Sequence, residues 1–299
     1  MKKILIILPL AILILLLAVF VVNKKAKDLS QPVNFIEASK PVVMENPELH
    51  KEIDKPKEKP TITQEAPENE IIPEKYQNQV AFTSQAPYAK WDDLHDEACE
   101  EASIIMAHAY LTDKEELEIS EAEDEIQKMV AFQKNYFGSH KDLNAEEMIE
   151  LAKEFYDQEY KLIKLESKEE PITTEEDQPE NQDLFEEAPK TDPQKTFQKN
   201  IDYLIKELSR DNIFIIPMAG RKLQNPYFRS PGPLYHALVL TGYDQNKKEF
   251  ITNDPGTRRG ENYHYSYEIF YEAIHDFPGQ KTKILEGAKN VILVEKNSL

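Results

Sequence analysis

The chain has 299 residues, a formal net charge of −19 and a single cysteine. The excess of acidic residues argues against nucleic-acid binding, because proteins that bind nucleic acid present basic patches that neutralise phosphate. One cysteine excludes an intrachain disulfide, so the chain is not a disulfide-stabilised secreted domain.

The N-terminal segment predicts a membrane anchor. Residues 4–22 form an apolar run that follows Lys2 and Lys3. As a helix this run is roughly 28 Å long, which matches the hydrocarbon core of a bilayer. A cleaved signal peptide is the alternative, but a lysine-rich stretch follows the run instead of a small-residue cleavage site. We expect residues 1–22 to be a single transmembrane signal-anchor with the remaining chain outside the cytoplasm, or a secreted protein if the segment is cleaved.

Two segments have compositions typical of disorder. Residues 23–78 are rich in proline, glutamate and lysine and poor in aromatic residues, so they cannot bury enough apolar surface to offset backbone entropy. They predict an extended tether. Residues of about 166–195 are acidic and contain four prolines, and they predict a disordered insertion. The folded domain is expected to span residues 79–299 around this insertion.

Within this domain, helices come first and strands second. A short strand-like run occupies 80–82. Four segments have apolar residues at helical spacing and are predicted as helices: 98–111, 121–137, 144–156 and 196–209. The third helix carries a capping-box signature, Asn144 with Glu147. Four later apolar runs predict strands: 213–218, 237–241, 249–252 and 290–294. This order indicates an α+β fold with an antiparallel sheet.

Cys99 stands at the start of the first predicted helix. A helix N-terminus favours a thiolate, because the unpaired N–H groups and the macrodipole lower the thiol pKa. His236 begins a predicted strand and Asp254 ends its predicted hairpin partner, so both lie at the same end of the hairpin. A cysteine nucleophile, a histidine base and an orienting carboxylate form a catalytic triad. A buried structural cysteine and a structural histidine are the competing interpretations.

Two further residues affect this interpretation. Asn253 is the alternative orienting group, and strand alternation points it away from Asp254, so one of the two can serve. Gln85 is the candidate oxyanion donor, together with the backbone N–H of Cys99.

Nearby acidic and histidine residues bear on the same thiol. Glu100 and Glu101 follow Cys99 and would raise the thiol pKa if they faced it. The histidines lack metal-ligand spacing, so we expect no metal and no cofactor.

Together these segments resemble a known family. The matching segments are Phe82–Trp91, Cys99–Ser103, Asn225–Phe228, Gly232–His236, Gly242–Asp244 and Asn253–Gly256. They are similar to the double-glycine-leader, bacteriocin-processing peptidase-like family of papain-like cysteine peptidases, which carries a peptidase C39-like domain. The resemblance spans about residues 79–297.

The resemblance implies a papain-like fold, in which an N-terminal helical part carrying the cysteine packs on an antiparallel sheet carrying the histidine and the aspartate. It also implies roles for four residues: Cys99 as nucleophile, His236 as base, Asp254 as orienting residue and Gln85 as oxyanion donor. The leader-cleaving role of transporter-fused members does not carry over, because the sequence contains no nucleotide-binding motif.

The expected function is a membrane-anchored peptidase that hydrolyses peptide or protein substrates through a thioester. A cell-wall peptide amidase or transpeptidase with the same acyl chemistry is an alternative. A catalytically silent binding module of the same fold is another.

Overall fold

The computed structural model describes residues 71–167 and 192–296. The predicted transmembrane segment at 1–22, most of the predicted tether and most of the predicted acidic insertion lie outside these residues. Within the described part, no helix has the length and apolar character needed to cross a bilayer.

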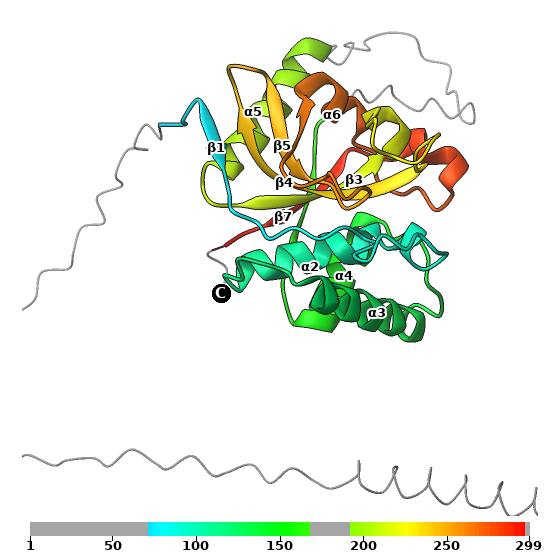
Figure 1. Cartoon of the computed structure of the whole chain (residues 1–299). Coiled ribbons are helices and arrows are strands. Elements are labelled where there is room, and N and C mark those ends of the chain that lie inside the picture. Colours follow the sequence, from blue (N-terminus) through cyan, green and yellow to red (C-terminus); the bar gives the residue numbers. More distant parts are fainter. Residues whose placement is uncertain (1–70, 168–191, 297–299) are drawn as a thin grey trace, which may run out of the picture. The chain divides into compact units, whose positions relative to one another are not determined.

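An antiparallel sheet forms the centre of the described structure (Figure 1). Six strands follow one another in the order β2-β7-β3-β4-β5-β6, and β1 pairs with β4. In chain order the strands of the described ranges are β1 (Lys75–Gln77), β2 (Lys161–Lys164), β3 (Ile213–Ala219), β4 (Tyr235–Asp244), β5 (Glu249–Asn253), β6 (Tyr263–Ser266) and β7 (Asn290–Val294).

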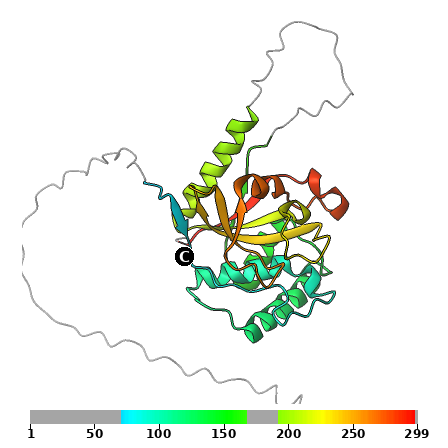
Figure 2. The same cartoon turned by 45° about the horizontal axis from the view of Figure 1, so that its top comes forward.

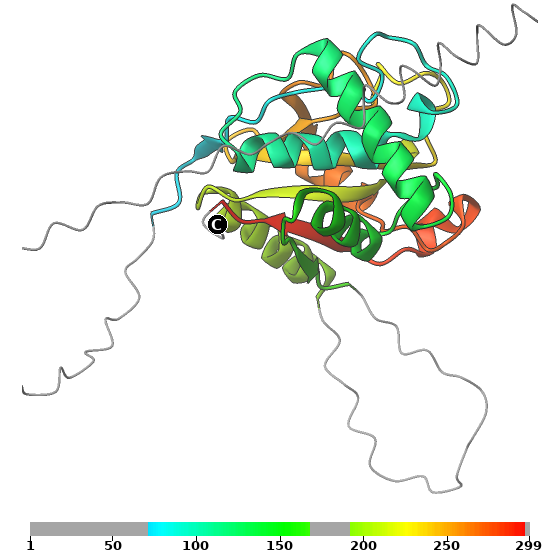
Figure 3. The same cartoon turned by 90° about the horizontal axis from the view of Figure 1, so that it is seen from below.

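Helices cover both faces of this sheet. Helices α2, α3 and α4 lie on one face, where α2 runs along the sheet (Figure 3), and α5 and α6 lie on the other (Figure 2). The helices are α2 (Cys99–Leu111), α3 (Ile119–Tyr136), α4 (Ala145–Tyr156), α5 (Pro193–Leu208) and α6 (Tyr267–Ala273). Three 3-10 turns complete the described elements: η1 (His95–Glu97), η2 (Gly220–Leu223) and η3 (Lys281–Glu286).

Alternation along the central strands creates two apolar cores. Ile213 and Ile215 of β3 pack with α2, α3 and α4, whereas Phe214 and Ile216 pack with α5 and α6. Successive side chains of a strand point to opposite faces, so a strand with helices on both sides is apolar throughout. This explains why the predicted strand at 213–218 reads as a continuous apolar run.

The sequence predictions identify most of the central elements. The four predicted helices correspond to α2, α3, α4 and α5, and the four predicted strands to β3, β4, β5 and β7. The capping box of α4 is confirmed, because Glu147 N donates to the Asn144 side chain and Asn144 N donates to that of Glu147. Helix α5 starts at Pro193 after the N-cap Asp192, so the last residues of the predicted insertion are helical.

The start of the domain differs from the prediction. Residues 80–82 form no strand, whereas β1, within the predicted tether, pairs with β4 in the register Gln77 to Gly242. The Asn78 side chain then donates to the carbonyls of Leu208 and Asn212. The predicted boundary at residue 79 is therefore too late, because tertiary pairing holds a short segment that has no strand-like pattern of its own. Strands β2 and β6 and helix α6 were not predicted.

Gly242 tests whether β1 belongs to the folded domain. A Cβ at this position would lie 2.4 Å from the carbonyl oxygen of Tyr76, so β1 would have to move. We expect Gly242→Ala to lower the free energy of unfolding by about 1–3 kcal/mol. Urea denaturation checks this, with the exposed Lys247→Ala as control. An unchanged midpoint for Gly242→Ala would show that β1 contributes nothing to stability.

Candidate active site

Cys99 is the first residue of α2 and its thiol is buried against the sheet. Its exposed fraction is 5 % and it is a free cysteine. Helix α2 packs on β4, and the backbone N–H of Ala237 in that strand hydrogen-bonds to the Cys99 sulfur. The packing of α2 on β4 thus holds Cys99 against Ala237, the residue that follows the base candidate His236 in the strand.

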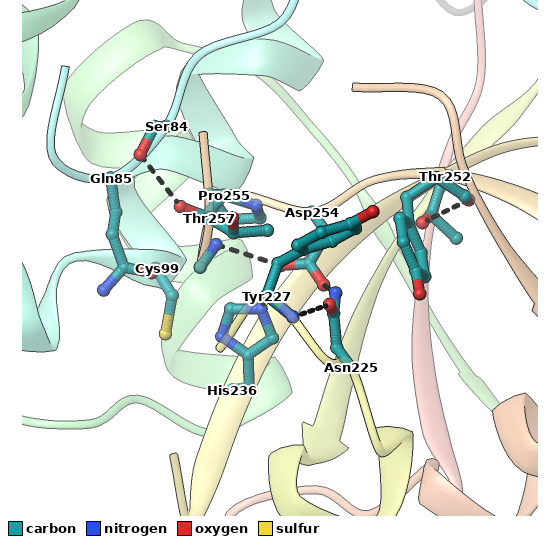
Figure 4. Close-up of polar contacts among 12 residues, drawn as sticks. Ser84, Gln85, Cys99, Asn225, Tyr227, His236, Thr252, Asp254, Pro255 and Thr257 are labelled. Carbon is teal, nitrogen blue, oxygen red and sulfur yellow. Dashed lines mark hydrogen bonds and ion pairs between the residues drawn. The ribbon is translucent and has the colours of Figure 1, made fainter. Parts of the chain in front are cut away.

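His236 and Asp254 form a buried hydrogen-bonded pair. The β4–β5 hairpin pairs Val239 with Asn253, which places both residues at the same end of the hairpin. His236 Nε2 lies 2.7 Å from Asp254 Oδ1. Because Nε2 is engaged by the carboxylate, Nδ1 is the ring nitrogen that remains for the thiol. In Figure 4 the Cys99 sulfur lies beside the His236 ring, and both residues line one pocket.

The carboxylate of Asp254 is held by several donors. Besides His236, the Gly256 N–H donates to Oδ1 at 2.9 Å, and Tyr265 and Asn225 donate to Oδ2 at 2.6 and 3.2 Å. Burial alone would raise the pKa of Asp254, but the charge and hydrogen bond of His236 and the other donors outweigh it and lower that pKa. The carboxylate is therefore charged and fixed, as an orienting group requires.

Asn253 points elsewhere, as strand alternation requires. Its amide donates to the Val80 carbonyl at 2.9 Å, and its side-chain oxygen accepts the Asn262 N–H at 3.1 Å. Asp254, and not Asn253, is therefore the group that contacts His236. Tyr265 and Asn225 complete the support of the carboxylate. The sequence offered no signal for Tyr265, because β6 is brought to the site by tertiary pairing.

Gln85 lies next to Cys99 (Figure 4), held by the loop that follows β5 and by η1. Its backbone N–H donates to the Pro255 carbonyl at 2.9 Å, and its side-chain Nε2 donates to the His95 carbonyl at 2.6 Å. His95 is itself fixed between Asp92, at 2.6 Å, and Glu123, at 3.1 Å. An amide nitrogen carries two protons, so Nε2 of Gln85 has a second N–H beyond its bond to His95, and Oε1 of Gln85 is buried without a hydrogen-bond partner.

The acidic residues after Cys99 turn inward. Glu100 and Glu101 have exposed fractions of 1 % and 0 %. The Cys99 sulfur donates to Glu100 Oε2 at 2.9 Å, and no described contact joins the sulfur to His236. Burial first, and then the Glu100 charge and hydrogen bond, raise the pKa of Cys99 well above its ordinary value, against the opposing effect of the Ala237 N–H. This arrangement therefore favours the protonated thiol of Cys99 over the thiolate.

A pocket of about 370 Å³ opens onto these groups. Its walls include Trp91 and Phe228, and Phe228 meets the His236 ring edge-on at a centroid distance of 5.3 Å. Two ion pairs flank it: Arg229 with Asp96 at 2.8 Å, and Lys281 with Asp142 at 3.3 Å. A larger cavity of about 820 Å³ lies by the C-terminal end of α2, but it contains neither a cysteine nor a histidine. The pocket of about 370 Å³ is therefore the candidate site, because both Cys99 and His236 line it.

Comparisons with known proteins identify a family for this chain. A model described as Peptidase_C39 like family matches residues 75–278. No curated protein matches the sequence significantly. Five solved chains match, among them the crystal structure of a candidate C39-like peptidase from Bacillus anthracis, with 15 % identity and a TM-score of 0.40. That match covers 74 % of this chain and 98 % of the other.

The lowered pKa of Asp254 gives a pH-dependent prediction. Its carboxylate stabilises the fold above the ordinary pKa of 3.8, and this contribution is lost as the pH falls through the lower, folded-state pKa. Asp254→Asn is expected to lower the free energy of unfolding by roughly 3 kcal/mol at about pH 7, and by less at about pH 3. Urea denaturation at both pH values checks this, with the exposed Asp202→Asn as control. An equal loss at both pH values would contradict it.

Proposed function

The chain belongs to the Peptidase_C39 like family, and from this premise we propose that it is a membrane-anchored cysteine peptidase that cleaves peptide bonds through Cys99, His236 and Asp254. The observation that carries the proposal is the buried contact between His236 and Asp254, which leaves Nδ1 facing the pocket that holds the thiol. Family membership supports a peptidase-like domain, whereas the catalytic triad and the membrane anchor belong to the proposal.

In this proposal Nδ1 of His236 takes the thiol proton and the Cys99 sulfur attacks the peptide carbonyl. The tetrahedral oxyanion receives hydrogen bonds from the free N–H of Gln85 and the backbone N–H of Cys99. The imidazolium, stabilised by Asp254, then protonates the leaving amine and a thioester remains. Water activated by the neutral imidazole hydrolyses the thioester and restores the thiol.

The walls of the pocket support a substrate that fills it with an apolar or aromatic side chain. Trp91 and Phe228 offer apolar surface, and the acidic groups Asp96, Asp142 and Glu97 have basic partners in Arg229 and Lys281. Paired charges attract a charged substrate less than unpaired ones, so Trp91 and Phe228 would supply the apolar contacts of recognition.

A binding module without activity is the second candidate. The hydrogen bond from Cys99 to Glu100 favours it, because a carboxylate beside the sulfur opposes thiolate formation. Enhanced reactivity of the thiol separates the two candidates.

Activity should depend on the proposed triad. Cys99→Ala and His236→Ala are each expected to lower kcat/KM by at least about 10³-fold, because nucleophile and base act as one unit. The matched control is His264→Ala, since His264 pairs with Glu249 outside the pocket. Hydrolysis of a peptide library and of peptidoglycan-derived peptides measures this and separates a peptidase from a cell-wall amidase. Full activity of His236→Ala would reject the triad.

The proposed anchor predicts the location of the protein. Residues 4–22 are long and apolar enough to span a bilayer, so full-length protein should stay with membranes after an alkaline carbonate wash. A chain that begins at residue 71 should be released. The mass of the mature protein decides the alternative: loss of about the first 22 residues would establish a cleaved signal and a secreted enzyme.

A further inference from the structure

The carboxyl group of Glu100 is held in place by two contacts. Oε2 accepts from the Cys99 sulfur at 2.9 Å, and Oε1 accepts from the Leu143 backbone N–H at 3.0 Å. Glu100 is almost fully buried, so its carboxyl oxygens depend on these protein contacts and not on hydrogen bonds to solvent. The arrangement is specific: one oxygen fixes the group to the loop after α3, and the other faces the nucleophile. The triad makes no use of this group.

We propose that Glu100 is a further catalytic residue that controls the thiol: as a carboxylate it holds the proton on Cys99, and as a neutral acid it donates a hydrogen bond to the thiolate. The inference rests on the proposed function, since it assigns the state of the proposed nucleophile. It predicts an enzyme whose reactive form requires Glu100 to be protonated, so its activity falls as the pH rises through the titration of Glu100.

The proton count follows from the contact. Activation breaks the S–H bond, transfers the proton to Nδ1 of His236 and leaves the electron pair on sulfur. With Glu100 ionised, this step would place two negative charges in hydrogen-bond contact, which strongly disfavours the thiolate. With Glu100 neutral, its O–H donates to the sulfur and stabilises the thiolate. Cys99, Glu100 and His236 therefore titrate as one coupled set.

The groups around Glu100 favour its neutral form. Glu101 adds negative charge from the same helix, and Asp142 adds it from the loop after α3. Burial first, and then these two charges, raise the pKa of Glu100 well above its ordinary value, against the lowering effects of Cys99 and the Leu143 N–H. Tyr235 of β4 also faces Glu100, and its own pKa is raised first by burial and then by that carboxyl group.

Lys281 and His140 lie beside the acidic neighbours of Glu100. Lys281 of η3 pairs with Asp142 and with Glu97 of η1. Burial still raises the pKa of Asp142 to about 6, against the opposing charge of Lys281. His140 lies 3.3 Å from Glu101 without forming a hydrogen bond. Neither basic side chain contacts Glu100, so the carboxyl group beside Cys99 has no cationic partner among the described residues.

Glu100→Gln isolates this effect. The amide oxygen can still accept from the Leu143 N–H, and the amide nitrogen donates to the sulfur, so the variant imitates the neutral acid at every pH. Cys99 is the only cysteine of the chain, so alkylation by iodoacetamide reports its thiolate directly. The matched control is Glu146→Gln, since Glu146 is an exposed residue at the second position of α4, as Glu100 is of α2.

The experiment compares the pH dependence of alkylation in full-length proteins in detergent. In the wild type and in Glu146→Gln, the rate is expected to fall as the pH rises through the titration of Glu100. In Glu100→Gln the rate should not fall, and at about pH 8 it should exceed the wild-type rate on the order of tenfold or more. Identical profiles for the wild type and Glu100→Gln would overturn the inference.

The pH dependence of alkylation in the wild type tests the role of Glu100 even if Glu100→Gln does not fold. A wild-type rate that rises with pH as a single thiol titration would also overturn the inference. His236→Ala separates this result from the proposed function. If His236→Ala lowers the alkylation rate of Cys99 and Glu100→Gln leaves it at the wild-type value, the triad is kept and the role of Glu100 is rejected. The reverse result keeps control of the thiol by Glu100 and rejects the triad.

Discussion

Helix α2 packs on β4 and is covered by α3 and α4, so that 12 of its 13 residues are buried. A helix surrounded on all sides has no solvent face for its polar residues. The same packing that brings Cys99 to the strand of His236 therefore brings Glu100 and Glu101 into the interior. The burial of α2 therefore sets both the position of the proposed nucleophile and the acidic surroundings of its thiol.

The imidazole side of the site is built differently. Asp254 is reached by donors from four places: the His236 ring, the Gly256 backbone in its own loop, the side chain of Asn225 after η2, and the side chain of Tyr265 in β6. A buried carboxylate is stable only when such donors replace water. The network also leaves little room: a Cβ on Gly256 would lie 2.8 Å from Cε1 of His236. The ring orientation is thus fixed from several elements at once.

What the sequence could predict depends on how local the cause is. The hairpin that places His236 and Asp254 at one end is readable, because two apolar runs and a short polar loop define it. Strand alternation also predicts that Asn253 and Asp254 diverge, although only the tertiary contacts decide which one meets the imidazole. Tyr265 was not predictable, since it arrives with β6. Neither was β1, whose three residues are strand only because β4 offers them an edge.

The direction of Glu100 was the open question that the sequence posed but could not answer. A helix N-terminus favours the thiolate by about 0.3–1 kcal/mol, and by up to about 2 kcal/mol in partly buried geometries. Two like charges about 4 Å apart repel by roughly 4 kcal/mol at an effective dielectric constant of about 20. Once Glu100 faces the thiol, an ionised carboxylate therefore outweighs the helix dipole. The position of Cys99 at a helix start is then insufficient to activate it, and the protonation state of its neighbour becomes decisive.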